Sequence, residues 1–181
     1  MKLRRGRYSG AKGFTLIEAG LATVIVGTGI LAALTLFATC ARQNLHSQRS
    51  TVAMALANNV QEAMGSLAFF DPQRSHAVHG PESGESLATF DDLDDFNNFT
   101  ASPPIDANRQ PITAMSQYSQ VITVRPVWPN QLSSNHNDSN PSIPASTYTG
   151  ALRVRVRVMY RATPSSPAEE VYQRSWICMD R

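Results

Sequence analysis

The hydrophobic positions of this chain fall into three successive patterns, and the first is an unbroken apolar run. Residues 19–41, 23 in number, include no charged side chain. As a helix with a rise of about 1.5 Å per residue, such a run is about 35 Å long, more than the roughly 30 Å of a bilayer's hydrocarbon core. The pattern therefore predicts a transmembrane helix, which we place at 14–41.

The second pattern is a stripe of hydrophobic residues at steps of three or four, with one double step. Its members are Leu45, Val52, Leu56, Val60, Met64 and Leu67. This spacing is typical of a helix with one buried face. No breaker separates it from the apolar run, so we expect one long helix with an amphipathic continuation over 42–70. Asp71-Pro72 is expected to end it, because proline disfavours helix at the preceding residue.

The third pattern, within residues 71–181, combines loops with alternating strands. Strands are predicted at 117–128, 151–161 and 170–179, with 71–115 rich in turn residues. The alternation points one set of side chains inward and the other outward. The inward set is Tyr118, Ile122, Val124 and Trp128, then Leu152, Val154, Val156, Val158 and Tyr160. These strands predict a small antiparallel sheet whose apolar face packs on the amphipathic half of the helix, an α+β fold.

A basic leader, residues 1–13, precedes the apolar run. It carries Lys2, Arg4, Arg5, Arg7 and Lys12. The positive-inside rule therefore places the N-terminus in the cytoplasm and residues 71–181 outside. Without the leader, 11 Lys+Arg remain against 14 Asp+Glu, a balance of −3 that gives no general attraction to nucleic acid.

Glu18 is the exception within the apolar segment. A carboxylate at membrane depth is costly unless it is paired, and it marks a functional site by default. A cut after Gly13 would free an amine on Phe14, four residues away. That amine can pair with Glu18 of the same chain or of a neighbour. Alternatively, Glu18 is an interfacial residue whose carboxylate reaches the lipid headgroups.

The segment Gly13-Phe14-Thr15-Leu16-Ile17-Glu18, between a basic leader and an apolar run, resembles the prepilin class. This class comprises type IV pilins, minor pilins and the pseudopilins of type II secretion. The segments from Leu21 to Leu31 and from Ala55 to Met64 are similar to the pilus-modification and minor-pseudopilin subgroup. The resemblance implies a pilin-like fold and no enzymatic activity.

The resemblance also implies a processing and assembly pathway. A prepilin peptidase would cut after Gly13 and methylate Phe14, and Glu18 would dock the N-terminal amine of an adjacent subunit. The expected protein is a structural minor pilin or pseudopilin, single-pass in the bacterial inner membrane with a periplasmic C-terminal domain. Its partners would be other pilin subunits, the inner-membrane assembly platform and the lipid bilayer.

Two alternative functions stay open. The first is a monomeric periplasmic ligand-binding protein, anchored by the helix or by a lipid on Cys40. The segment Leu36–Cys40 is similar to a lipoprotein cleavage site, although Thr39 stands where a smaller residue is preferred. The second is a DNA-uptake pilin that uses Arg153, Arg155 and Arg157. We interpret these arginines instead as a solvated sheet face or a subunit contact.

An acidic segment is a weak candidate for a metal site. The carboxylates of Asp91, Asp92, Asp94 and Asp95 suit calcium, which takes oxygen ligands, but their spacing differs from that of an EF-hand loop. We interpret the segment as an acidic, solvated loop pinned by Phe90, Leu93, Phe96 and Phe99.

The remaining candidate chemistry is sparse. His76 and His79 have no further histidine or cysteine nearby to complete a zinc set. The sequence contains no G-x-S-x-G nucleophile motif and no phosphate-binding glycine loop, so we expect no catalytic activity. Cys40 and Cys178 lie far apart in the chain, and we expect both to be free or buried.

Overall fold

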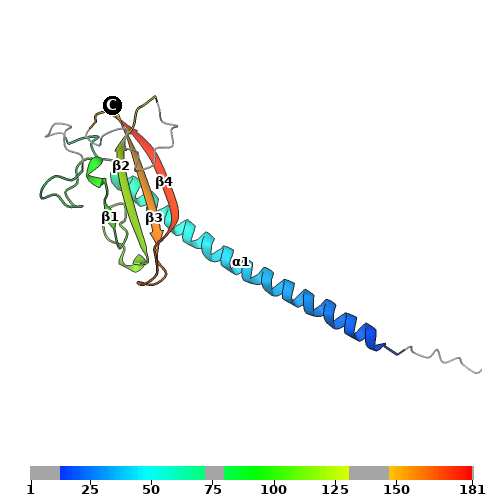
Figure 1. Cartoon of the computed structure of the whole chain (residues 1–181). Helices are drawn as coiled ribbons and strands as arrows, with labels where there is room; N and C mark the ends of the chain where they lie inside the picture. Colours follow the sequence, from blue (N-terminus) through cyan, green and yellow to red (C-terminus); the bar gives the residue numbers. More distant parts are fainter. Residues whose placement is uncertain (1–12, 72–79, 131–146, 181) are drawn as a thin grey trace, which may run out of the picture. The chain divides into compact units, whose positions relative to one another are not determined.

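The computed structural model describes residues 13–71, 80–130 and 147–180, and its architecture is α+β and pilin-like. A long N-terminal helix packs against a four-stranded antiparallel sheet (Figure 1). The elements are α1 (Leu16–Met64), η1 (Asp94–Phe96), β1 (Thr100–Ala101), η2 (Thr113–Met115), β2 (Tyr118–Pro126), β3 (Ala151–Tyr160) and β4 (Glu169–Met179). The expected fold class is thus confirmed.

The chain divides into two compact units, residues 1–46 and 47–181, and the boundary falls inside α1. In the first unit, threonine hydroxyls form hydrogen bonds with the backbone of the helix itself, which suits an apolar environment. The hydroxyls of Thr23, Thr28, Thr35 and Thr39 donate to backbone carbonyls three or four residues earlier in the helix. These bonds satisfy the hydroxyls without water.

α1 ends earlier than predicted, at Met64 rather than at Asp71-Pro72. Gly65, a poor helix former, follows directly, and its N–H donates to the Glu62 carbonyl oxygen at 3.1 Å in a tightened last turn. The chain then turns, and Ala68 forms an isolated parallel bridge with Asp92. The helix therefore stops because glycine and this backbone pairing intervene before the proline is reached.

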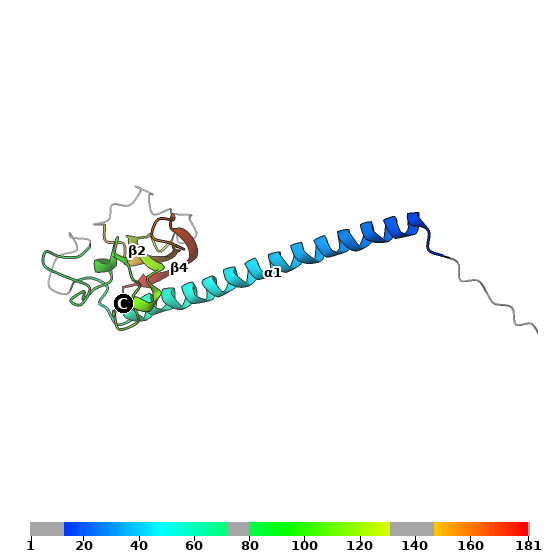
Figure 2. The same ribbon diagram turned by 90° about the horizontal axis from the view of Figure 1, so that it is seen from below.

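In the second unit, the buried face of α1 consists of Ala53, Leu56, Ala57, Val60, Ala63 and Met64. Leu56, Val60 and Met64 belong to the predicted stripe, whereas Leu45 is 54% exposed. The alanines were not part of the prediction. Figure 2 shows the end of α1 that follows residue 47 lying along one face of the sheet.

The sheet has the strand order β1-β2-β3-β4, with every neighbouring pair antiparallel. The three predicted strands are present, and β1 is a short additional strand at one edge. In register, Val154 of β3 lies opposite Val124 of β2 on one side and Trp176 of β4 on the other. Trp128 is not inward as predicted: β2 ends at Pro126, and Val127 is buried in its place.

Among the described residues, Gln120 of β2 is a polar side chain that is fully buried in the core. Its amide nitrogen donates to the carbonyl oxygens of Leu56 in α1 at 2.8 Å and Ile105 at 3.1 Å. Its amide oxygen accepts the N–H of Ile105 at 2.7 Å. Gln120 therefore fastens the helix, a loop and β2 to one another through three hydrogen bonds.

Candidate functional site

Gly13 and Phe14 precede the first turn of α1 and are open to solvent, with the Phe14 side chain 74% exposed. Nothing lies within 4 Å of a Cβ built on Gly13. The leader residues before them lie outside the described residues. The peptide bond between Gly13 and Phe14 is thus accessible, as cleavage by a peptidase requires.

Glu18 and Thr15 form a capping box at the N-terminus of α1. A Glu18 carboxylate oxygen, Oε2, accepts the Thr15 N–H at 2.9 Å and the Thr15 hydroxyl at 3.0 Å. In return, the Thr15 hydroxyl accepts the Glu18 N–H at 3.3 Å. This reciprocal arrangement satisfies N–H groups that the start of a helix leaves unpaired. The sequence signal for it, Thr-x-x-Glu, lies inside the hexapeptide that carries the family resemblance.

The apolar part of α1 exposes its large side chains around the whole helix. Leu21, Val24, Ile25 and Leu36 are all exposed, and no residue of the most apolar window is buried. In the described part of the chain, α1 is the one helix long and apolar enough to cross a membrane. These properties are compatible with a single-pass anchor or a signal sequence.

The arginines of β3 are less solvated than predicted. Arg153, Arg155 and Arg157 are half-buried, and the Nε atoms of Arg155 and Arg157 are inaccessible to solvent. Thr123 and Ser175 lie on either side of Arg155 in register, and arginine commonly buries its apolar stem along such a surface while its charged end stays in water. The prediction of a solvated face is therefore wrong for the stems of these side chains.

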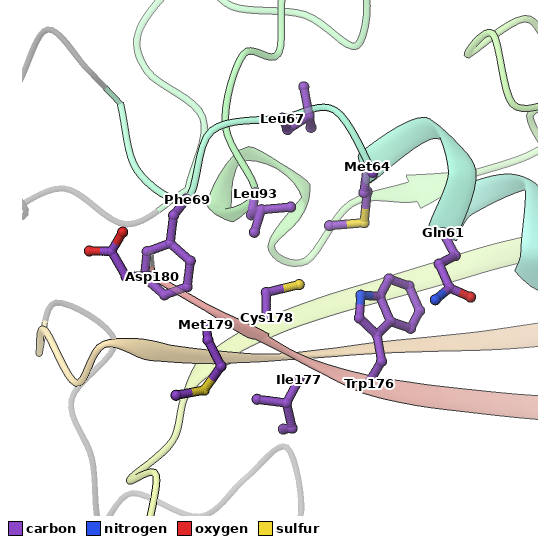
Figure 3. Close-up of a pocket in the computed structure, with 11 residues that line it drawn as sticks. Gln61, Met64, Leu67, Phe69, Leu93, Trp176, Ile177, Cys178, Met179 and Asp180 are labelled. Carbon is purple, nitrogen blue, oxygen red and sulfur yellow. The ribbon is translucent and has the colours of Figure 1, made fainter.

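A pocket of about 670 Å³ lies between the end of α1 and β4 (Figure 3). Met64, Leu67 and Trp176 line it together with the polar side chains of Gln61 and Asp180, and Cys178 points into it. Both cysteines are free, with Cys40 exposed and Cys178 half-buried. Burial raises the pKa of the Cys178 thiol, which disfavours the thiolate needed of a nucleophile. Cys178 is therefore not poised to act as a nucleophile in this pocket.

The acidic loop, residues 80–99, is pinned by aromatic residues as predicted. Phe90, Leu93 and Phe96 are buried, and the ring centroids of Phe90 and Phe96 are 5.1 Å apart, edge to face. Arg109 also binds the loop, because its Nη1 donates to the Phe90 carbonyl oxygen at 2.6 Å.

Three of the four aspartates of this loop are not solvated, which corrects the sequence prediction. Asp91 is exposed, but Asp92, Asp94 and Asp95 are only 2%, 3% and 1% exposed. The reason is local hydrogen bonding to the backbone. Asp92 Oδ1 accepts the N–H groups of Asp94 and Asp95 at 2.9 and 3.1 Å, and Asp94 Oδ2 accepts the Gly80 N–H at 2.9 Å.

Crowding of these carboxyls changes their acidity. Burial and the neighbouring Asp94 raise the pKa of Asp92 to about 8, and burial raises that of Asp95 to about 6. The pKa of Glu82 rises to about 7, chiefly through a hydrogen bond with Glu85. Sequence reasoning missed Glu82 and Glu85, which lie 10 residues upstream of Asp92 and Asp95 and join them only through the turn of the loop.

His76 and His79 lie outside the described residues. Comparisons with protein-family models, with curated proteins and with solved structures found no match to this chain.

Proposed function

We propose that the protein is a minor-pilin or pseudopilin subunit, cut after Gly13 by a prepilin peptidase and assembled into a filament from the bacterial inner membrane. The observation that carries the proposal is the start of α1. There an accessible Gly13–Phe14 bond stands directly before the apolar part of α1, and Glu18, in the first turn, is the single acidic residue of that part, residues 16–46.

The exposed apolar surface supports this proposal. Around the first half of α1, large aliphatic side chains have no protein partner in the described chain. Water cannot be their final environment, because each exposed aliphatic side chain forgoes about 1.5–3 kcal/mol of transfer free energy. Lipid covers such a helix before assembly, and the helices of neighbouring subunits cover it afterwards.

In this proposal, the Glu18 carboxylate has one partner in the single subunit and another in the assembled filament. In the single subunit its carboxylate caps its own helix through Thr15. After cleavage, the new Phe14 amine of a neighbouring subunit provides a positive charge that a backbone N–H does not. An ion pair in a low-dielectric setting is worth more than a neutral hydrogen bond, so the carboxylate favours the assembled state.

Substitution of Glu18 separates assembly from helix capping. Glutamine also serves at the third position of a capping box, so Glu18→Gln keeps the cap but loses the charge. We expect Glu18→Gln and Glu18→Ala to be processed normally and to be absent from sheared filaments, measured by immunoblot. Normal incorporation of Glu18→Gln would show that capping alone is the role of Glu18 and would contradict the docking mechanism.

Substitution of Gly13 tests the processing step. We expect Gly13→Ala to accumulate as uncut precursor, because a side chain at this position obstructs the peptidase. Gly10→Ala, the same change within the leader, is the matched control and should be cut normally. Filaments that contain uncut Gly13→Ala protein would contradict the proposal.

A further inference from the structure

Four arginines lie on the face of the sheet that points away from residues 47–64 of α1. They are Arg125 of β2 and Arg153, Arg155 and Arg157 of β3, and we call them the arginine face. Between them on β3, Val154 and Val156 are buried on the opposite face, against α1 (Figure 2). Alternate residues of a strand are about 7 Å apart, so β3 presents three guanidinium side chains in a row at that interval.

Positive charge is concentrated on this face. Arg125 lies directly opposite Arg153 in register, a like-charge pair that destabilises a sheet. Of the described residues of β2, β3 and β4, the one acidic side chain that the register places on the same face is Glu170, opposite Met159. The chain without its leader is acidic, with 11 Lys+Arg against 14 Asp+Glu. A positive patch on such a chain is suited to a partner of negative charge.

Two of the four side chains are held against the sheet. Arg125 and Arg157 are half-buried, and their Nε atoms are inaccessible to solvent. These Nε atoms have no hydrogen-bond partner among the described residues, so no described carboxylate binds either guanidinium side-on. Side chains that are already ordered lose little conformational entropy when a partner binds. Arg125 and Arg157 therefore present ordered, positively charged ends to a ligand.

The spacing of the row favours an extended acidic segment of protein. A guanidinium binds a carboxylate through two parallel hydrogen bonds. In an extended segment, the side chains at every second position point the same way and are also about 7 Å apart. Aspartate or glutamate at alternating positions of such a segment therefore matches the interval between Arg153, Arg155 and Arg157.

Nucleic acid fits this face less well. Proteins that bind single strands provide aromatic rings on which the bases stack. The outward positions of the described strands β2, β3 and β4 hold no aromatic side chain, and those between and beside the arginines include Val121, Thr123, Ser175 and Ile177. The negative balance of the chain without its leader also opposes the general attraction to phosphates on which such binding depends.

We propose that the arginine face binds an extended acidic segment of another protein, with aspartate or glutamate at alternating positions. This inference goes beyond the proposed function, and its test does not depend on processing at Gly13 or on assembly of a filament.

The test is titration of the full-length protein, in a non-ionic detergent, against a fluorescent peptide of alternating glutamate and serine about ten residues long. We expect saturable binding, measured by fluorescence anisotropy. It should weaken by about threefold or more when the salt concentration rises from about 0.05 to 0.5 M, because salt screens exposed charges. The same peptide with glutamine in place of glutamate should not bind.

Two results of this titration would overturn the proposal. The first is no binding at up to about 1 mM peptide, or equal binding of the glutamine peptide. The second is equal or tighter binding of an oligothymidylate of the same length, which would assign the arginine face to nucleic acid instead.

Variants locate the binding site. Arg125→Gln and Arg157→Gln should each weaken peptide binding by about threefold or more, and thermal melts check that both stay folded. Arg157→Lys keeps the charge and an apolar stem but loses the planar fork, so it should weaken binding without disturbing the packing of the sheet. Arg42→Gln removes the same charge from an exposed position of α1 and is the matched control. Unchanged binding by both sheet variants, or an equal loss in Arg42→Gln, would refute the arginine face as the site.

Discussion

Gln120 shows how a single buried polar residue connects elements far apart in the chain. Its three hydrogen bonds join residues of α1, of β2 and of the loop that carries Ile105. Gln120 was not among the predicted inward residues, and nothing in the sequence indicates which backbone groups it would meet. Those partners are set by how the helix and loop pack, which residue periodicity does not encode.

Loss of these bonds should destabilise the domain. We expect Gln120→Leu to lower the free energy of unfolding by about 1–3 kcal/mol, because the Ile105 N–H would stay buried without a partner. Gln173→Leu, on the exposed face of β4, should change it by less than about 0.5 kcal/mol. Denaturant unfolding measures both, and equal effects of the two changes would contradict this role of Gln120.

The carboxyls of the acidic loop predict an unusual pH dependence. Glu82, Asp92 and Asp95 have pKa values of about 7, 8 and 6 in the folded domain, above the ordinary 4.5 and 3.8. The folded state therefore binds these protons more tightly than the unfolded chain does. Their contribution is largest below about pH 4 and is lost as the pH rises to about 8.

In EDTA, the unfolding temperature should thus fall by about 5 °C or more between pH 5 and pH 8. Asp92→Asn removes the group with the highest pKa of the three while keeping an acceptor for the Asp94 and Asp95 N–H groups. It should flatten the dependence. Thermal melts followed by circular dichroism provide the measurement, and an unfolding temperature that rises over this range would contradict the prediction.

Among the elements, α1 shows where periodicity succeeds and where it fails. Leu56, Val60 and Met64 follow the predicted stripe and are buried. The alanines between them were not predicted, because a small side chain carries little weight in a hydrophobic pattern. Ala53 and Ala57 are nonetheless fully buried, so the space beside them has no room for a larger residue.

A larger side chain at this interface should therefore destabilise the domain. We expect Ala57→Leu to cost about 1–3 kcal/mol through overpacking. Ala55→Leu makes the same change at an exposed position of the same helix and should alter stability by less than about 0.5 kcal/mol. Urea unfolding of the two variants checks this, and an equally small effect of Ala57→Leu would show that the interface is loosely packed.

The acidic loop is the element that the sequence described least well. The prediction that aromatic residues pin the loop is confirmed. The run of aspartates was predicted to be solvated, because charged side chains are rarely buried without a partner. Here the N–H groups of Asp94 and Asp95 in η1 donate to Asp92 Oδ1, which allows the Asp92 carboxylate to be buried. Glu82 and Glu85 join them through a turn whose course no spacing rule predicts.

For the whole molecule, the two halves of α1 have different requirements. The half in residues 47–64 packs on the sheet, whereas the half in residues 16–46 is exposed among the described residues, and we propose that lipid or other subunits cover it. The hydropathy of the sequence predicted this division, and the fold class followed from the strand alternation. Both are properties of local pattern, which is why they could be read from the sequence alone.

The most direct test of the account is the mass and N-terminal sequence of the protein purified from a cell that has a prepilin peptidase. We predict a single product that begins at N-methylated Phe14 and lacks the 13 preceding residues. A product that retains Met1, or one that begins at a lipid-modified Cys40, would contradict it.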